Sequence, residues 1–247
     1  RASRVSIARC ETYDLLEVTA AVRAALEPLG GMGAFVPPGA RVLLKPNVLS
    51  GAAPEKAVTT HPAVVEAAIE LVREAGGVPC VGDSPGVGDS ESALRGAGIA
   101  EVLDRLSVAS ANFSDAVDVT CRDNVVGKKL PLARAVKDVD LVISLPKLKT
   151  HVQMVFTGAI KNQYGLIPGL RKGQYHFRLN NRDKLADLMV DITRASAPVL
   201  AIMDAVVGME GEGPGGGDPR KIGVLIAGAD LAAVDTVACG IIGQPAD

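Results

Sequence analysis

Short apolar runs alternate with helix-like patterns along most of this chain. Residues 42–44 are a first apolar run, and after a polar stretch, apolar residues recur at helical spacing from Pro62 to a stop at Gly76 and Gly77. A second run at 78–82 leads to a short helical pattern at 91–97, and a third run at 140–145 follows. Strand and helix patterns in this order predict consecutive βα units and a largely parallel sheet.

The second half of the chain continues the same alternation. A helical pattern through 185–192 precedes an apolar run at 198–203, then come a fifth candidate strand at 222–227 and a final helix at 231–242. Residues 108–135 instead alternate apolar and polar positions between charged turns, as an antiparallel insert would. We therefore predict an α/β fold, with a mainly parallel sheet, helices on both faces and a small antiparallel insert, as a single domain over residues 1–247.

One segment is low in complexity. Residues 208–217 contain six glycines in ten positions, a composition that does not hold a helix. We expect a loop here, either as a mobile lid or as plain disorder.

Composition narrows the class of protein. The chain has 247 residues with 26 Lys and Arg against 28 Asp and Glu, and its seven aromatic residues include no Trp. A dedicated nucleic-acid binder needs a cationic surface, so the balanced charge argues against that class. The scarcity of aromatic residues leaves Ala, Val, Leu and Ile to form the core, which suits a sheet covered by helices.

The cysteines and the length of the apolar runs exclude further classes. Cys10, Cys80, Cys121 and Cys239 stand at least 41 positions apart, so the chain has no short Cys or His module for zinc or an iron–sulfur cluster. No apolar run approaches the ~18 residues that span a bilayer, and no secretion signal opens the sequence. We expect a cytoplasmic protein without a membrane segment.

The candidate chemistry lies directly after the predicted strands, where open parallel sheets bind their ligands. The polar residues there are Lys45, Asn47, Thr59, Thr60 and His61 after the first strand, Asp83 and Ser84 after the second, Lys147, Lys149, Thr150 and His151 after the third, and Asp204, Glu210 and Glu212 after the fourth. We expect Lys45, Lys147, Lys149, Asp83 and His151 to meet in one cleft that favours a small anionic ligand.

Individual residues in this set have two interpretations. A histidine near a helix start is often a capping residue, but a pair of imidazoles beside lysines can also transfer a proton or hold a metal. Asp83 and Ser84 precede Pro85 and Gly86, so they form either a tight turn or a ligand contact.

Lys161 stands out because it follows the start of a predicted helix. If Thr157 caps a helix at 158–166, the macrodipole disfavours the cation by several tenths of a kcal/mol. Lys161 then has either an anionic partner or a lowered pKa suited to nucleophilic or Schiff-base chemistry. The alternative is a side chain that reaches water along Ile160 and Tyr164.

Several of these segments together resemble the bacterial and archaeal family collected as domain of unknown function 362. The matching segments are 43–48 (Leu-Leu-Lys-Pro-Asn-Val), 60–62, 82–86, 145–151 (Leu-Pro-Lys-Leu-Lys-Thr-His), 156–162, 165–169 and 230–235. Members are often associated with iron–sulfur clusters through a C-terminal ferredoxin-like region with cysteine-rich motifs. This sequence has no such motifs, so the resemblance implies a cluster only through a region that is absent from it.

The segment 151–169 is also similar, more distantly, to nickel-dependent lactate racemases. That likeness implies Lys161 as the tether of a metal-containing nucleotide cofactor, His151 and His61 as proton-transfer residues, and His176 as a metal ligand. The racemases' Asp-His-Thr-Arg substrate motif is missing, and Lys45-Pro-Asn47 stands at the comparable loop.

Two functions from different classes follow from the sequence. In the first, the cleft binds a small anionic ligand or a metal-containing cofactor and performs redox or proton-transfer chemistry, as a racemase-like or redox enzyme would. Its catalytic residues are His151, Lys161 and His61, its ligand- or cofactor-binding residues are Lys45, Asn47, Asp83, Ser84, Lys147 and Lys149, and its metal ligand is His176. In the second, the protein is a non-catalytic binding or scaffold module that partners an iron–sulfur electron-transfer domain.

Overall fold

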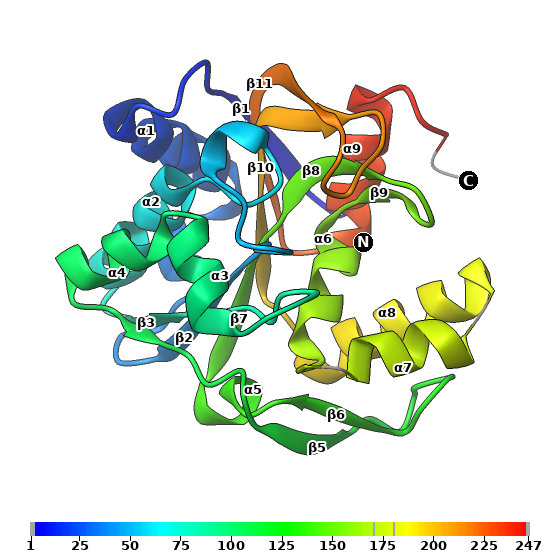
Figure 1. Ribbon diagram of the computed structural model, residues 1–247. Helices are drawn as coiled ribbons and strands as arrows, with labels where there is room; N and C mark the ends of the chain where they lie inside the picture. The colour runs from blue at the N-terminus through cyan, green and yellow to red at the C-terminus, as the bar shows by residue number, and fades with distance from the viewer. Residues whose placement is uncertain (1–2, 170, 180, 246–247) are drawn as a thin grey trace.

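The computed structural model describes residues 3–169, 171–179 and 181–245, and it has a large sheet at its centre (Figure 1). The sheet order is β1 (Val5–Arg9), β11 (Asp218–Gly228), β10 (Leu200–Glu210), β7 (Leu141–Leu145), β2 (Arg41–Pro46), β3 (Val78–Val81) and β4 (Ala109–Ser110). The five strands from β10 to β4 are parallel, whereas β1 and β11 join antiparallel at one edge. The predicted α/β fold with a mainly parallel sheet is confirmed.

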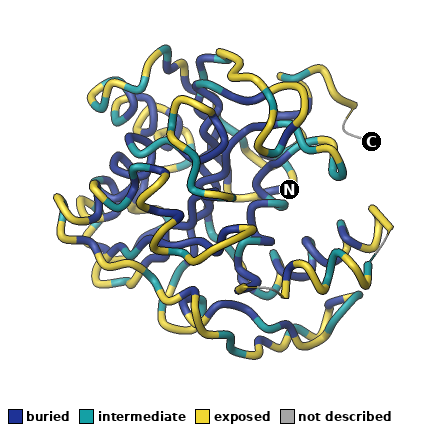
Figure 2. The backbone as a smooth tube through the Cα atoms, viewed as in Figure 1, coloured by how far each residue is buried: buried dark blue, intermediate teal, exposed yellow. Residues whose placement is uncertain are grey.

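Helices cover both faces of this sheet. On one face lie α1 (Leu15–Leu26), α2 (Pro62–Glu74), α3 (Ser90–Gly96) and α4 (Ile99–Leu106), and on the other lie α6 (Ala159–Asn162), α7 (Arg171–Arg178), α8 (Arg182–Ser196) and α9 (Leu231–Ile241). Successive strand residues point to opposite faces, so Leu44 packs against the first helical layer and Leu43 against the second. This explains why the strands read as continuous apolar runs, and why they form the buried centre in Figure 2.

The antiparallel insert is also confirmed. β5 (Ala116–Thr120) and β6 (Lys129–Ala133) pair as a separate two-stranded sheet, followed by the short helix α5 (Ala135–Asp138). The buried carboxylate of Asp191 on α8 accepts hydrogen bonds from the backbone N–H groups of Val125, Val126 and Gly127. This contact attaches the turn of the insert to α8.

Two segments differ from the sequence-based expectation. Residues 147–151, expected as a loop, form the strand β8 (Lys147–His151), which pairs with the second half of β10 and with β9 (Val155–Thr157). The predicted glycine-rich loop begins only after Glu210, because 208–210 continue β10. Gly208 passes so close to β8 that a Cβ there would lie 2.8 Å from the Leu148 carbonyl oxygen, so glycine permits this pairing.

The opening strand β1 and helix α1 have no counterpart among the predicted elements. In the part of the chain that the structure describes, no helix is long and apolar enough to cross a membrane.

Candidate functional site

A cavity of about 220 Å³ lies where the ends of β2, β3 and β8 meet α6 and α7. We call it the lysine–histidine pocket; it is lined by Asn47, Leu49, Asp83, Ser84, Gly86, His151, Lys161, Asn162, Tyr164, Gly165, Lys172, Gly173 and His176. Six of the ten residues to which the sequence analysis gave a catalytic, binding or metal-ligand role line it: Asn47, Asp83, Ser84, His151, Lys161 and His176. The other four, Lys45, Lys147, Lys149 and His61, do not.

Lys45 and Asp83 form a buried ion pair behind the pocket. Lys45 Nζ lies 2.7 Å from Asp83 Oδ1 and donates to Asn162 Oδ1 and the Pro46 carbonyl, each at 3.0 Å. Burial lowers the pKa of Lys45, and the Asp83 charge opposes that shift. A Cβ on Gly165 would lie 2.0 Å from Asp83 Oδ1, so the chain can pass here only as glycine. Lys45 is therefore engaged by protein groups and does not line the pocket.

Helix α6 positions Lys161, and its N-terminus differs from the expectation. Gly158 is the N-cap residue and Thr157 belongs to β9, so the predicted Thr157 cap is wrong. The buried carboxylate of Asp235 on α9 accepts instead from the backbone N–H groups of Ala159 and Ile160, at 2.5 and 3.0 Å. A carboxylate from another element thus satisfies the first amides of the helix.

The ammonium group of Lys161 has no partner of its own. Within the described residues, no carboxylate lies within ion-pair distance of Lys161 Nζ, and Lys161 Nζ donates no hydrogen bond. Burial lowers the pKa of Lys161 to about 8, and the charge of Lys45 adds to that shift, while Asp83 opposes it. Lys161 and His151 line the same pocket, which is where the sequence led us to expect both.

Lys172 is a residue of this pocket that the sequence analysis missed. Lys172 Nζ donates to the Ser84 carbonyl at 2.6 Å and to Ser84 Oγ at 2.7 Å, and burial lowers its pKa to about 8. Tyr164 Oη donates to the Lys172 carbonyl at 2.7 Å. In the sequence Lys172 follows Arg171 in a polar segment, a pattern that predicts an exposed lysine. Its contact with Ser84 arises only in the folded protein, so the sequence carried no signal for it.

His151 is held in one tautomer. Its Nδ1 accepts hydrogen bonds from the backbone N–H groups of Gln153 and Met154, both at 3.2 Å. Burial, together with the charge of Lys161, lowers its pKa to about 3, so the ring is neutral at pH 7 with its proton on Nε2. His151 therefore offers a hydrogen-bond donor, while its other nitrogen is already occupied.

His176 is placed by α7 and by an aromatic neighbour. Its ring stands edge-on to the Tyr164 ring, with centroids 5.3 Å apart and planes at 87°. Burial and the charge of Lys161 lower its pKa, which favours the uncharged form of this imidazole.

His61 and Lys147 belong to a different cluster. Lys147 Nζ lies 2.9 Å from Asp204 Oδ2 and donates to Tyr13 Oη at 2.8 Å. His61 stacks on the Tyr13 ring at 3.6 Å, and its Nδ1 accepts from the Ala63 N–H at the start of α2. His61 therefore caps the start of α2, which was one of the two interpretations of this histidine. Lys147 has a buried carboxylate partner in Asp204.

Lys149 does not line the pocket but orients Asn47, which does. Its Nζ, nearly inaccessible to solvent, donates to Asn47 Oδ1 at 3.1 Å and to the Val58 carbonyl at 2.5 Å. Because an ammonium group only donates, the Asn47 oxygen must face Lys149, and the Asn47 amide N–H groups are left for other partners. Burial lowers the pKa of Lys149 well below its ordinary value, with Lys161 and Lys147 adding to the shift.

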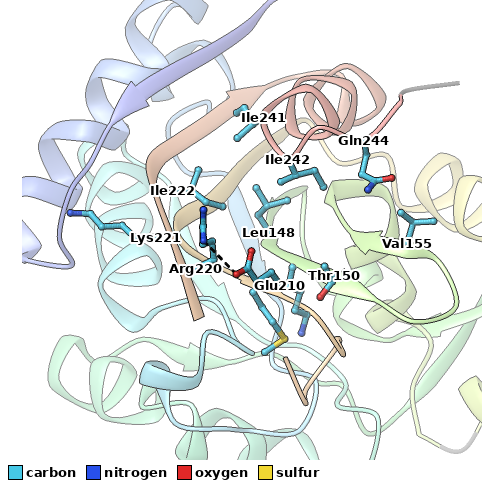
Figure 3. Close-up of a pocket in the computed structure, with 12 residues that line it drawn as sticks. Leu148, Thr150, Val155, Glu210, Arg220, Lys221, Ile222, Ile241, Ile242 and Gln244 are labelled. Carbon is cyan, nitrogen blue, oxygen red and sulfur yellow. Dashed lines mark ion pairs between the residues drawn. The ribbon is translucent and has the colours of Figure 1, made fainter. Parts of the chain in front are cut away.

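A second cavity of about 520 Å³ lies on the other side of β8 (Figure 3). Its walls include Leu148, Ile222, Ile241 and Ile242, with a solvent-exposed ion pair between Arg220 and Glu210 at 3.5 Å. None of the three histidines lines it. Its volume is larger and Lys149 also lines it, but the lysine–histidine pocket is lined by Lys161, Lys172 and both His151 and His176, whose pKa values burial lowers.

Among the described residues, the side chains of the pocket do not form a site that would hold a free metal ion by themselves. Within residues 3–169, 171–179 and 181–245, no three His, Cys, Asp or Glu side chains are grouped to hold a metal ion. In the pocket, Asp83 is paired with Lys45 and His151 Nδ1 accepts backbone hydrogen bonds. His176 has no companion ligands there, so its role as a metal ligand stays a prediction.

Comparisons with known proteins give a family and a fold. A family model described as domain of unknown function DUF362 matches residues 42–240. A relative from Synechocystis sp., named as a thylakoid-associated protein, is 40% identical over 239 residues, covering 96% of this chain and 74% of the relative. The lactate racemase apoprotein from Thermoanaerobacterium thermosaccharolyticum has a similar structure, with a TM-score of 0.58 at 10% identity. That match covers 96% of this chain, but this chain spans only 56% of the racemase chain.

Proposed function

The chain belongs to the DUF362 family and shares its fold with a lactate racemase apoprotein. From this premise we propose that the lysine–histidine pocket binds a small anionic ligand and catalyses proton transfer to and from that ligand. One observation carries the proposal: Lys161 and Lys172 both face the cavity, and Asp83, the one carboxylate among its described lining residues, is paired with Lys45. The cavity is therefore left with uncompensated positive charge.

Charge and size define the ligand class. Cationic groups in a cleft with low-dielectric walls concentrate their field on an incoming anion. A cavity of about 220 Å³ is smaller than the ~300–1,000 Å³ of ordinary drug-sized ligand sites. A small carboxylate or inorganic phosphate fits these limits better than a nucleotide.

The neutral groups of the pocket suit proton transfer on such a ligand. His151 Nε2–H and the Asn47 amide supply hydrogen bonds to ligand oxygen atoms. The Lys161 amine, with its pKa of about 8, is the group able to accept and return a proton near neutral pH, and the His176 imidazole in the same pocket offers a hydrogen-bond acceptor.

Thermal melting with lactate or phosphate as the probe tests this proposal. A ligand at ten times its Kd stabilises the folded protein by about 1.4 kcal/mol, so millimolar lactate or phosphate should raise the Tm by a few degrees. Lys161→Met and Lys172→Met should lose most of the shift, whereas Lys56→Met, at an exposed position, should keep it. Sodium chloride at matched ionic strength is the control, and an equal shift with chloride contradicts the proposal.

A further inference from the structure

Five buried or half-buried lysines surround the ends of the central strands, and one of them differs from the rest. Lys45 and Lys147 are paired with carboxylates, while Lys149 and Lys172 each donate two hydrogen bonds to neutral oxygen atoms. Lys161 alone, among the described residues, lines the cavity without an acceptor for its amine. In the part of the chain that the structure describes, this amine takes part in no hydrogen bond or ion pair.

We propose that Lys161 is a covalent carbonyl-binding residue, whose amine condenses with the carbonyl carbon of a small α-oxo acid to form an imine inside the lysine–histidine pocket. This inference rests on the proposed function and specifies the chemistry and the substrate class of the same site.

The condensation requires no oxidant and no further reactant. The Lys161 nitrogen lone pair attacks the carbonyl carbon, and the carbonyl oxygen takes a proton to give a carbinolamine. The C–O bond then breaks, the oxygen leaves as water, and a C=N bond to the lysine nitrogen forms. Amine and carbonyl compound thus yield imine and one water molecule, and no electrons are gained or lost.

The charges around Lys161 favour the amine that this reaction needs. Lys45 lies on β2, Lys149 on β8, and Lys172 and His176 on α7. Burial disfavours the ammonium form of Lys161, the charge of Lys45 adds to this effect, and Asp83 opposes it. His151 is neutral, and the carboxylate of Asp83 is paired with Lys45. The pKa of about 8 leaves roughly a tenth of the Lys161 side chains as free amine at pH 7.

The same surroundings favour an α-oxo acid over a neutral aldehyde. The carboxylate beside the carbonyl carbon would lie among Lys172, His151 and the Asn47 amide, all of which line the cavity. Glyoxylate and pyruvate are small enough for a cavity of about 220 Å³.

Reductive trapping tests the inference directly. The protein is incubated with millimolar glyoxylate and sodium cyanoborohydride, digested, and analysed by mass spectrometry for carboxymethylated lysine. We expect Lys161 to be modified at least ten times faster than exposed Lys56, with the rate rising from pH 7 to pH 9. Lys161→Arg keeps a positive charge but has no condensing amine, so it should abolish the rapid modification while still binding glyoxylate in thermal melting.

The outcomes separate this inference from the proposed function. If glyoxylate raises the Tm but Lys161 reacts no faster than Lys56, or if Lys172 is the rapidly modified residue, the covalent inference is overturned and anion binding survives. If glyoxylate neither raises the Tm nor modifies Lys161, both fail. Rapid modification that is lost in Lys161→Arg, with the Tm shift retained, supports both.

Discussion

At the scale of single residues, the site is built from lysines that burial makes unlike ordinary lysines. Four of the five donate to defined oxygen atoms and so hold Asp83, Ser84, Asn47 and Asp204 in place. Breaking the buried ion pair of Lys45 or Lys147 leaves an uncompensated charge and costs about 3–5 kcal/mol, whereas removing Lys149 or Lys172 leaves buried neutral acceptors without a donor and costs about 1–3 kcal/mol. Lys161 has no such partner, and its removal should affect function rather than folding.

Lys161→Met should therefore leave the free energy of unfolding within about 1 kcal/mol of the parent or increase it. The pKa of Lys161 is lower in the folded state, so its charged form destabilises the fold below pH 8, and this penalty disappears as the pH rises toward 10.5. The advantage of the Met variant should be largest below pH 8 and absent above about pH 10.5. Urea unfolding at several pH values measures this, and a variant that is less stable at pH 7 would contradict the unpartnered amine.

At the scale of elements, the short helix α6 depends on a neighbour to present Lys161. Four residues do not form a stable helix by themselves, and Gly158 at its start provides no capping side chain. Asp235 of α9 supplies the cap, and a Cβ at Gly158 would lie 2.2 Å from its Oδ1. The placement of Lys161 is thus a property of two elements packed together.

Asp235→Ala should lower stability by about 1–3 kcal/mol, because buried backbone N–H groups lose their acceptor, and it should also slow the trapping of Lys161. Asp230→Ala is the matched control, since Asp230 caps α9 itself through Ala232 and Ala233 and lies outside the pocket. It should lower stability by about 1 kcal/mol with no effect on trapping. Equal effects of the two variants on trapping would show that α6 keeps its position without Asp235.

At the scale of the whole molecule, Asp204 joins distant parts of the chain beside the pocket. Its carboxylate contacts Tyr13 before α1, the backbone N–H of His61 at the start of α2, and Lys147 on β8. These partners come from widely separated positions, and their contacts with Asp204 join the first helical layer to β8 and β10.

Asp204→Ala should destabilise the protein by about 3–5 kcal/mol, because the buried Lys147 ammonium would lose its counter-charge. The double variant Asp204→Leu with Lys147→Met should recover most of that loss, since it removes both charges together. Thermal and urea unfolding of both variants measure the difference. A single variant as stable as the parent would show that Lys147 finds another partner or gives up its proton.

The sequence by itself determined the layers of this protein, and only the tertiary structure decided what its polar residues do. Apolar periodicity is local, so the strands at 42–44, 140–145 and 198–203 and the helix from Pro62 could all be predicted from neighbours along the chain. The burial of a charge is not local, because it requires a partner supplied by the fold. The segment with Lys147 and Lys149 resembles a polar loop in the sequence, because their partners Asp204 and Asn47 are distant along the chain. Lys172 likewise finds its acceptor, Ser84, 88 positions away.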